Sequence, residues 1–184
     1  MSVPTVWNID PVHSNVEFAV RHLMISTVKG RFGDVKGTVE LDFTNPAAAR
    51  LDVTIGVESV DTRNADRDAH LRSADFFDAV NFPAMRYVSR SVKVLPDGTF
   101  RVLGDLTIRG TTREVPLVAT LEGTGADSWG GQRAGFSASG KLNRGDFGLH
   151  WNKVLEAGGV TVGEEVKLIV EAELVQAAAT AAAA

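Results

Sequence analysis

The residues of this chain that could perform chemistry include four histidines: His13, His22, His70 and His150. Three histidines together with an acidic residue could hold a metal ion. Their spacing matches no local metal-binding motif. A histidine on an apolar strand face is also more often a hydrogen-bonded core or rim residue than a ligand. The sequence therefore predicts no metal site.

One histidine, His13, lies close to Asp10 and Ser14, which are the residue types of a nucleophilic triad. Neighbours in an extended chain point to opposite faces, so this spacing argues against a triad. Asp10 and Ser14 are better explained as turn residues, with the turn fixed by Pro11.

Residues 61–72 alternate positive and negative side chains. Arg63, Arg67 and Arg72 could clamp a pyrophosphate or another polar head group. Because aspartates are interleaved with them, much of the field that an anion needs would be cancelled, and ion pairs on a solvated helix face are the simpler interpretation. The chain contains no phosphate-binding glycine loop, no GxSxG elbow and no HExxH motif.

The composition is typical of one globular domain. The chain has 184 residues, of which 44% are hydrophobic and 23% charged, with a net charge of −4 and no cysteine. This balance argues against a nucleic-acid-binding protein, and the lack of cysteine excludes a disulfide framework. No apolar run is long enough for a membrane helix. The first residues lack the pattern of a secretory signal, which predicts a cytoplasmic location.

Alternation of apolar and polar residues dominates the chain and predicts an all-β, antiparallel fold. Turn residues such as Asn45-Pro46 separate the alternating segments, and no long helix alternates with them. Eight such strands could stack as a sandwich or close into a barrel, and closure would remove the exposed edges and allow the barrel to hold one small ligand. The eight predicted strands are 15–22, 35–43, 51–57, 85–94, 100–108, 115–121, 134–142 and 166–174.

Two segments interrupt this pattern. Residues 64–79 predict a short helix between the third and fourth strands, followed by a hydrophobic plug of Phe76, Phe77 and Phe82. The glycine-rich residues 146–163 form the second interruption. Residues 1–176 are predicted to be a single domain, and 177–184 are an alanine-rich tail.

The predicted barrel interior is rich in aromatic residues but also contains small ones. Small inward residues would leave room along the axis for a long hydrocarbon, whose burial yields about 0.8 kcal/mol per methylene. The pattern alone does not separate such a tunnel from a filled core. These small residues are Gly37, Gly104, Ala119, Ala134, Ala138 and Gly140.

Six blocks of the sequence, in order, resemble the YceI-like family. The segment WNIDPVHSNVEFAVRH at 7–22 resembles the family's opening, and SVDTRNADRDAHLRSADFFD at 59–78 is similar to its helical insertion. The remaining blocks are VKGRF at 28–32, LGDLTIRGTTREV at 103–115, ASGKLNRGDFGL at 138–149 and VGEEVKL at 162–168.

The resemblance implies an extended, eight-stranded lipocalin-like barrel whose tunnel binds a polyisoprenoid, such as a long prenyl diphosphate or a prenylated quinone. It implies a binding protein that carries, stores or sequesters this lipid, with no cofactor and no catalytic residues. Barrels of this family can pair, which makes a homodimer a further expectation. Two other functions stay open: a small-barrel enzyme with a histidine site at the tunnel mouth, and a filled barrel that serves only as an interaction module.

The predicted ligand contacts are inward aliphatic and aromatic residues together with one histidine. They are Val16, Phe18, Val20, His22, Phe32, Val39, Leu41, Val53, Ile55, Phe76, Phe77, Phe82, Phe100, Val102, Leu106, Phe136, Phe147 and Trp151. The candidates for holding a polar head group are His13, Arg63, Arg67 and His70.

Overall fold

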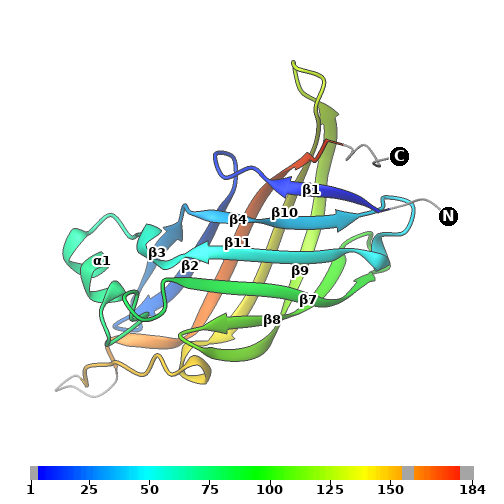
Figure 1. Ribbon diagram of the computed structural model, residues 1–184. Coiled ribbons are helices and arrows are strands. Elements are labelled where there is room, and N and C mark those ends of the chain that lie inside the picture. Colours follow the sequence, from blue (N-terminus) through cyan, green and yellow to red (C-terminus); the bar gives the residue numbers. More distant parts are fainter. Residues whose placement is uncertain (1–3, 155–159, 179–184) are drawn as a thin grey trace.

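The computed structural model describes residues 4–154 and 160–178, and these form a long β-barrel with one short helix (Figure 1). The alanine-rich tail predicted at 177–184 falls outside the described residues from 179 onward. The strands are β1 (Thr5–Ile9), β2 (Asn15–His22), β3 (Ser26–Phe32), β4 (Val35–Leu41), β5 (Arg50–Gly56), β6 (Val60–Asp61), β7 (Ala84–Val94), β8 (Phe100–Ile108), β9 (Thr111–Ala126), β10 (Gln132–Asn143) and β11 (Val162–Gln176). The helix is α1 (Ala65–Arg72), and three short 3-10 turns are η1 (Pro46–Ala48), η2 (Val57–Ser59) and η3 (Arg144–Phe147).

The barrel closes because β11 has partners along both edges. One edge pairs with β10, and the other pairs first with β2 and then, farther along the strand, with β1. The two short strands therefore act as one interrupted strand. The same holds for β3 and β4, which pair with β2 and β1, and for β6 and β5, which pair with β3 and β4. All pairings are antiparallel, and the ring of eight strands confirms the predicted barrel.

Three of the short strands, β1, β3 and β6, are absent from the sequence-based prediction. Val6 is exposed, and the stretch Ser26–Phe32 has glycine at an inward position, so neither segment shows a long alternation. Gly30 is needed there because a Cβ atom would lie only 2.4 Å from Cζ of Phe18, which packs over it. Such short strands are recognised by their partners rather than by their own pattern.

The predicted helical insertion is present but shorter than expected. Helix α1 begins after Asn64, whose side chain accepts a hydrogen bond from the backbone N–H of Arg67, as an N-cap does. It ends at Arg72, with Ser73 as the C-cap, and the rest of the segment up to Ala79 forms turns in which Asp78 has a left-handed conformation with φ of 51°. The phenylalanines that follow the helix lie in this turn region, at one end of the barrel (Figure 1).

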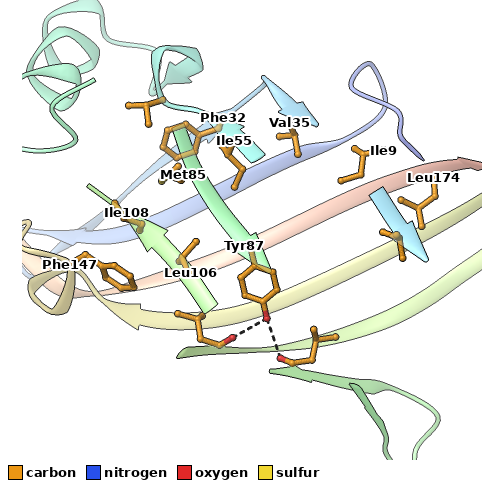
Figure 2. Packing of buried hydrophobic residues seen from close by; sticks show 14 of the residues in the cluster. Ile9, Phe32, Val35, Ile55, Met85, Tyr87, Leu106, Ile108, Phe147 and Leu174 are labelled. Carbon is orange, nitrogen blue, oxygen red and sulfur yellow. Dashed lines mark hydrogen bonds between the residues drawn. The ribbon is translucent and has the colours of Figure 1, made fainter. Parts of the chain in front are cut away.

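Buried side chains pack against one another along the inner wall of the barrel. Figure 2 shows Ile55, Met85, Leu106 and Tyr87 in this cluster, and the Tyr87 hydroxyl donates to the backbone oxygen of Val115 at 3.0 Å. This packing corrects one expectation. Gly104 does not leave open space, because a Cβ there would lie 2.3 Å from Cζ of the Tyr87 ring that covers it.

The space beside two further small residues is also occupied by neighbouring atoms. A Cβ atom at Gly140 would lie 2.7 Å from a methyl group of Leu117, and one at Gly37 would meet the backbone of β5. Of the small residues predicted to leave room, only Ala119 and Ala138 face the open interior. In the part of the chain that the structure describes, no helix is long and apolar enough to cross a membrane.

Candidate functional site: an apolar barrel cavity

The barrel encloses an elongated cavity of about 680 Å³. Its walls are the inward side chains of the strands, with α1 contributing at one end. Exposed residues belong to the lining at both ends: Arg21 of β2 and Asp66 of α1 at one end, and Phe43, which is 43% exposed, at the opposite end. The cavity therefore reaches the surface and has the size of a small-molecule site.

The inward side chains differ in how much open space they border. Inward side chains such as Phe18, Leu117 and Phe136 are only half-buried although they point into the interior, whereas Ile55 and Leu106 on the facing wall are buried. An inward residue keeps accessible surface only where it borders empty space. The free volume therefore borders β2, β9 and β10, and the half-buried Leu51 and Val53 show that it also reaches β5.

Sixteen of the eighteen predicted ligand contacts line this cavity, counted among the lining residues. The other two lie outside the lining. Phe82 covers Gly110, where a Cβ atom would be 3.0 Å from its ring, and Phe147, the last residue of η3, is 1% exposed. Residue type alone does not tell whether a phenylalanine in a connecting segment faces the cavity or packs against neighbouring segments. Contact of the lining residues with a ligand stays a prediction.

Aromatic rings gather at the α1 end of the cavity. Phe18, Phe32 and Phe77 form a chain of contacts with ring centroids 5.7 and 5.6 Å apart. Beside them, Trp151 packs edge-on against His70 with centroids 4.6 Å apart and lies 5.4 Å from Phe76. Edge-to-face geometry of this kind stabilises aromatic pairs. These rings narrow the cavity at the α1 end.

Two of the four head-group candidates line the cavity, Arg67 and His70, both on α1. The Arg67 guanidinium donates through Nε to Oγ1 of Thr62 at 2.7 Å and through Nη2 to the Thr62 carbonyl at 2.8 Å. Thr62 is fixed in turn by Asp68. Within the described residues Nη1 of Arg67 makes no hydrogen bond, so this donor is available to a ligand.

The other two candidates lie elsewhere. Arg63 is exposed and has a left-handed backbone, with φ of 60°. His13 lies in the connection between β1 and β2, where its Nδ1 is 2.9 Å from a carboxylate oxygen of Asp10. Neither lines the cavity. The structure therefore places Arg67 and His70 on the cavity wall and His13 and Arg63 outside it.

The surroundings of His13 contain the one described group of residues suited to a metal ion: Asp10, His13 and Glu173. Arg133 already lies between these carboxylates, with Nη1 2.8 Å from Asp10 and in contact with Glu173. The guanidinium occupies the place that a cation would need. The group is explained as an ion-pair network, in which Asp10 raises the pKa of His13, and His13 and Arg133 hold the pKa of Asp10 well below its usual range.

Arg144 borders the cavity but is missing from the predicted site. It is 6% exposed, and its guanidinium donates to the backbone oxygens of Gly163, Leu149, Trp151 and Val162. Burial lowers its pKa, although Glu164 opposes this shift. This side chain ties the segment after β10 to β11. A lone arginine in a polar loop gives no sequence indication that it is buried.

A closed antiparallel barrel of eight strands defines the class of small β-barrels, whose interior is either filled by side chains or holds one small ligand. Within this class, the chain belongs to the YceI-like family. The model of the YceI-like domain matches residues 7–174, which confirms the resemblance seen in the sequence blocks.

Relatives in several bacteria share most of this chain. Protein YceI of Escherichia coli O157:H7 is 44% identical over 165 residues, which cover 89% of this chain and 82% of the relative. The crystal structure of a Campylobacter jejuni YCEI protein has a TM-score of 0.69 at 30% identity and covers 86% of this chain and 90% of its own. A polyisoprenoid binding domain from Saccharophagus degradans shares the fold, with a TM-score of 0.68 at 13% identity, covering 95% of this chain and 99% of its own.

Proposed function

We propose that the cavity binds the hydrocarbon chain of a polyisoprenoid, and that the protein carries, stores or sequesters this lipid without transforming it. The observation that carries the proposal is the shape and chemistry of the cavity. It is long and walled by aliphatic and aromatic side chains, and polar groups gather mainly at the α1 end. Burial of each methylene in such a space contributes about 0.8 kcal/mol. The name of the Saccharophagus degradans domain, which shares the fold, supports the choice of ligand.

The polar groups at the α1 end suggest how the lipid is oriented. The head group lies beside Arg67, whose Nη1 points to no protein acceptor among the described residues, and near His22 and His70. The tail extends toward Phe43 at the other end. A diphosphate or the oxygens of a quinone ring could each accept from the arginine.

The alternative of a histidine-based enzyme lacks a comparable observation. His22 and His70 both line the cavity, but His70 is hydrogen-bonded to Asp75 at 2.9 Å and held between aromatic rings. These contacts account for His70 as a structural residue at the rim of the cavity, and no catalytic role is needed to explain it.

Native mass spectrometry of freshly purified protein, followed by solvent extraction, tests the proposal. We expect a mass excess that is released as an isoprenoid lipid. A ligand-free protein that also fails to bind a prenylated quinone added in detergent micelles would contradict it. Arg67→Gln distinguishes the two head groups. Because charge-assisted hydrogen bonds are strong, the variant should lower the affinity for a prenyl diphosphate about tenfold or more and the affinity for a quinone less.

A further inference from the structure

Apolar side chains are exposed at the tips of the loops around the α1 end of the barrel. Met24 and Ile25, in the turn between β2 and β3, are 55% and 80% exposed, and Val154 is 77% exposed. Large exposed apolar side chains gathered at one place mark an interaction surface more often than chance. We name Met24, Ile25 and Val154 the apolar rim.

Backbone hydrogen bonds connect the two segments that carry the apolar rim. The N–H of Leu23 donates to the oxygen of Thr161 at 2.9 Å, and Thr161 donates to the oxygen of Lys153 at 3.1 Å. Val154 pairs with Val160 in an isolated bridge. The β2–β3 turn and the Val154 segment therefore lie side by side.

The β2–β3 turn holds its apolar side chains outward at a conformational cost. Leu23 and Met24 have φ angles of 50° and 59°, a left-handed conformation that glycine and asparagine adopt readily and bulky apolar residues do not. Arg21 reinforces the turn by donating from Nη2 to the Met24 oxygen at 2.6 Å. Strain that is kept at an exposed apolar position indicates a function for that position.

The apolar rim is continuous with the opening of the cavity. Residues next to it in the chain or in the sheet, namely Arg21, His22 and Val162, line the cavity. A surface that contacts the apolar rim would therefore also cover the place where a lipid enters or leaves.

The charges around the opening have both signs. Arg21 and Lys153 are exposed beside the apolar rim, but so are Asp66 and Glu164. Such a surface has no strong preference for an anionic partner. It fits a bilayer of zwitterionic phospholipids, in which apolar side chains enter the acyl boundary while charges of both signs stay among the head groups.

We propose that the α1 end docks onto a zwitterionic phospholipid bilayer by inserting the apolar rim, with the cavity opening facing the membrane. The proposal rests on the proposed function, since docking places the opening where a membrane-dissolved isoprenoid is found. It names a partner and an orientation that lipid binding alone does not require.

Flotation with phosphatidylcholine vesicles tests the docking. The wild-type protein should float with the vesicles, and the double variant Met24→Ser, Ile25→Ser should lose about tenfold or more of its partitioning. The matched control is Val12→Ser with Trp129→Ser, which removes two apolar side chains that are more exposed (82% and 87%) and lie outside the apolar rim, in the β1–β2 connection and the β9–β10 turn. The control should float like the wild type.

Three results would overturn the docking proposal: a wild-type protein that does not float, a control variant that loses binding as strongly as the rim variant, or binding that needs anionic lipid. Titration with a prenylated quinone in detergent micelles separates this from the proposed function. The rim variant should keep wild-type affinity in micelles. If neither the wild type nor the rim variant binds quinone in micelles, the proposed lipid binding is wrong. The flotation result would still test docking independently.

Discussion

Two small residues set the width of the cavity and allow a direct test of lipid binding. Ala138 of β10 lies opposite Ala119 of β9 and, on its other side, opposite Val170 of β11, and all three line the cavity. Ala138 is about 16 Å along β10 from the end of the strand at Asn143, since a strand rises about 3.3 Å per residue. Ala138→Phe would therefore place an aromatic ring partway down the cavity.

The size of the effect follows from the apolar area that the ring removes from the ligand. A phenylalanine side chain covers about 150 Å² or more. At about 25 cal/mol per Å², the lost contact is about 4 kcal/mol, which corresponds to about a thousandfold weaker binding. Because the new ring enters empty space, the free energy of unfolding should stay equal to that of the wild type or rise.

The assay is a titration with a fluorescent prenyl probe, together with urea unfolding of each variant. Ser139→Phe is the matched control, because it adds the same ring to the next residue of β10, which is exposed on the outer face. It should bind the probe like the wild type. Wild-type affinity in a folded Ala138→Phe protein would refute the idea that the ligand occupies this cavity.

Three further perturbations test parts of the site and its support. Arg144→Met should destabilise the protein by about 3–5 kcal/mol in urea unfolding, because four backbone oxygens lose their buried donor; Arg144→Lys should recover part of this loss, and a fully stable Arg144→Met would contradict it. Asp10 raises the pKa of His13, so the stabilisation is complete below the ordinary histidine pKa and is lost as pH rises through the raised value; His13→Ala should flatten that part of the curve of Tm against pH, and an unchanged curve would argue against the contact. Gly30→Ala should push the overlying ring into the cavity and weaken probe binding, whereas Gly33→Ala, with open space around it, should not; equal effects would show that crowding is not the cause.

The barrel was predictable because most of its strands carry their own alternation. Segments such as Val35–Leu41 and Phe100–Ile108 bury every second residue, and this is what a half-solvated sheet demands. The interruptions were not predictable in the same way. Thr5–Ile9 is only five residues long, and it is a strand because β4 and β11 supply partners on both sides.

The candidate site was predictable in its apolar wall and less so in its polar and empty parts. Alternation places Phe18 or Phe136 on the inner face, but it does not say whether space remains there. Gly104 shows this, because a small inward residue opens no cavity when the Tyr87 ring covers it. Arg144 shows the reverse: only tertiary structure reveals that four backbone oxygens surround its guanidinium. Lipid binding, homodimerisation and a cytoplasmic location stay predictions.

The two ends of the cavity are closed in different ways, one by strand pairing and the other by α1. This difference explains why the polar groups Arg67 and His70 lie at the α1 end. At the end near β1, backbone hydrogen bonds close the ring through the pairing of Trp7–Ile9 with Leu174–Gln176. At the other end β5 leaves β7 after Gly56, and among the described residues β6 pairs only with β3. That gap in the ladder is covered by α1 and the aromatic residues around it. Because a helix and not a strand covers this gap between β6 and β7, Arg67 and His70 of α1 can line the cavity. A continuous wall of strands would exclude them.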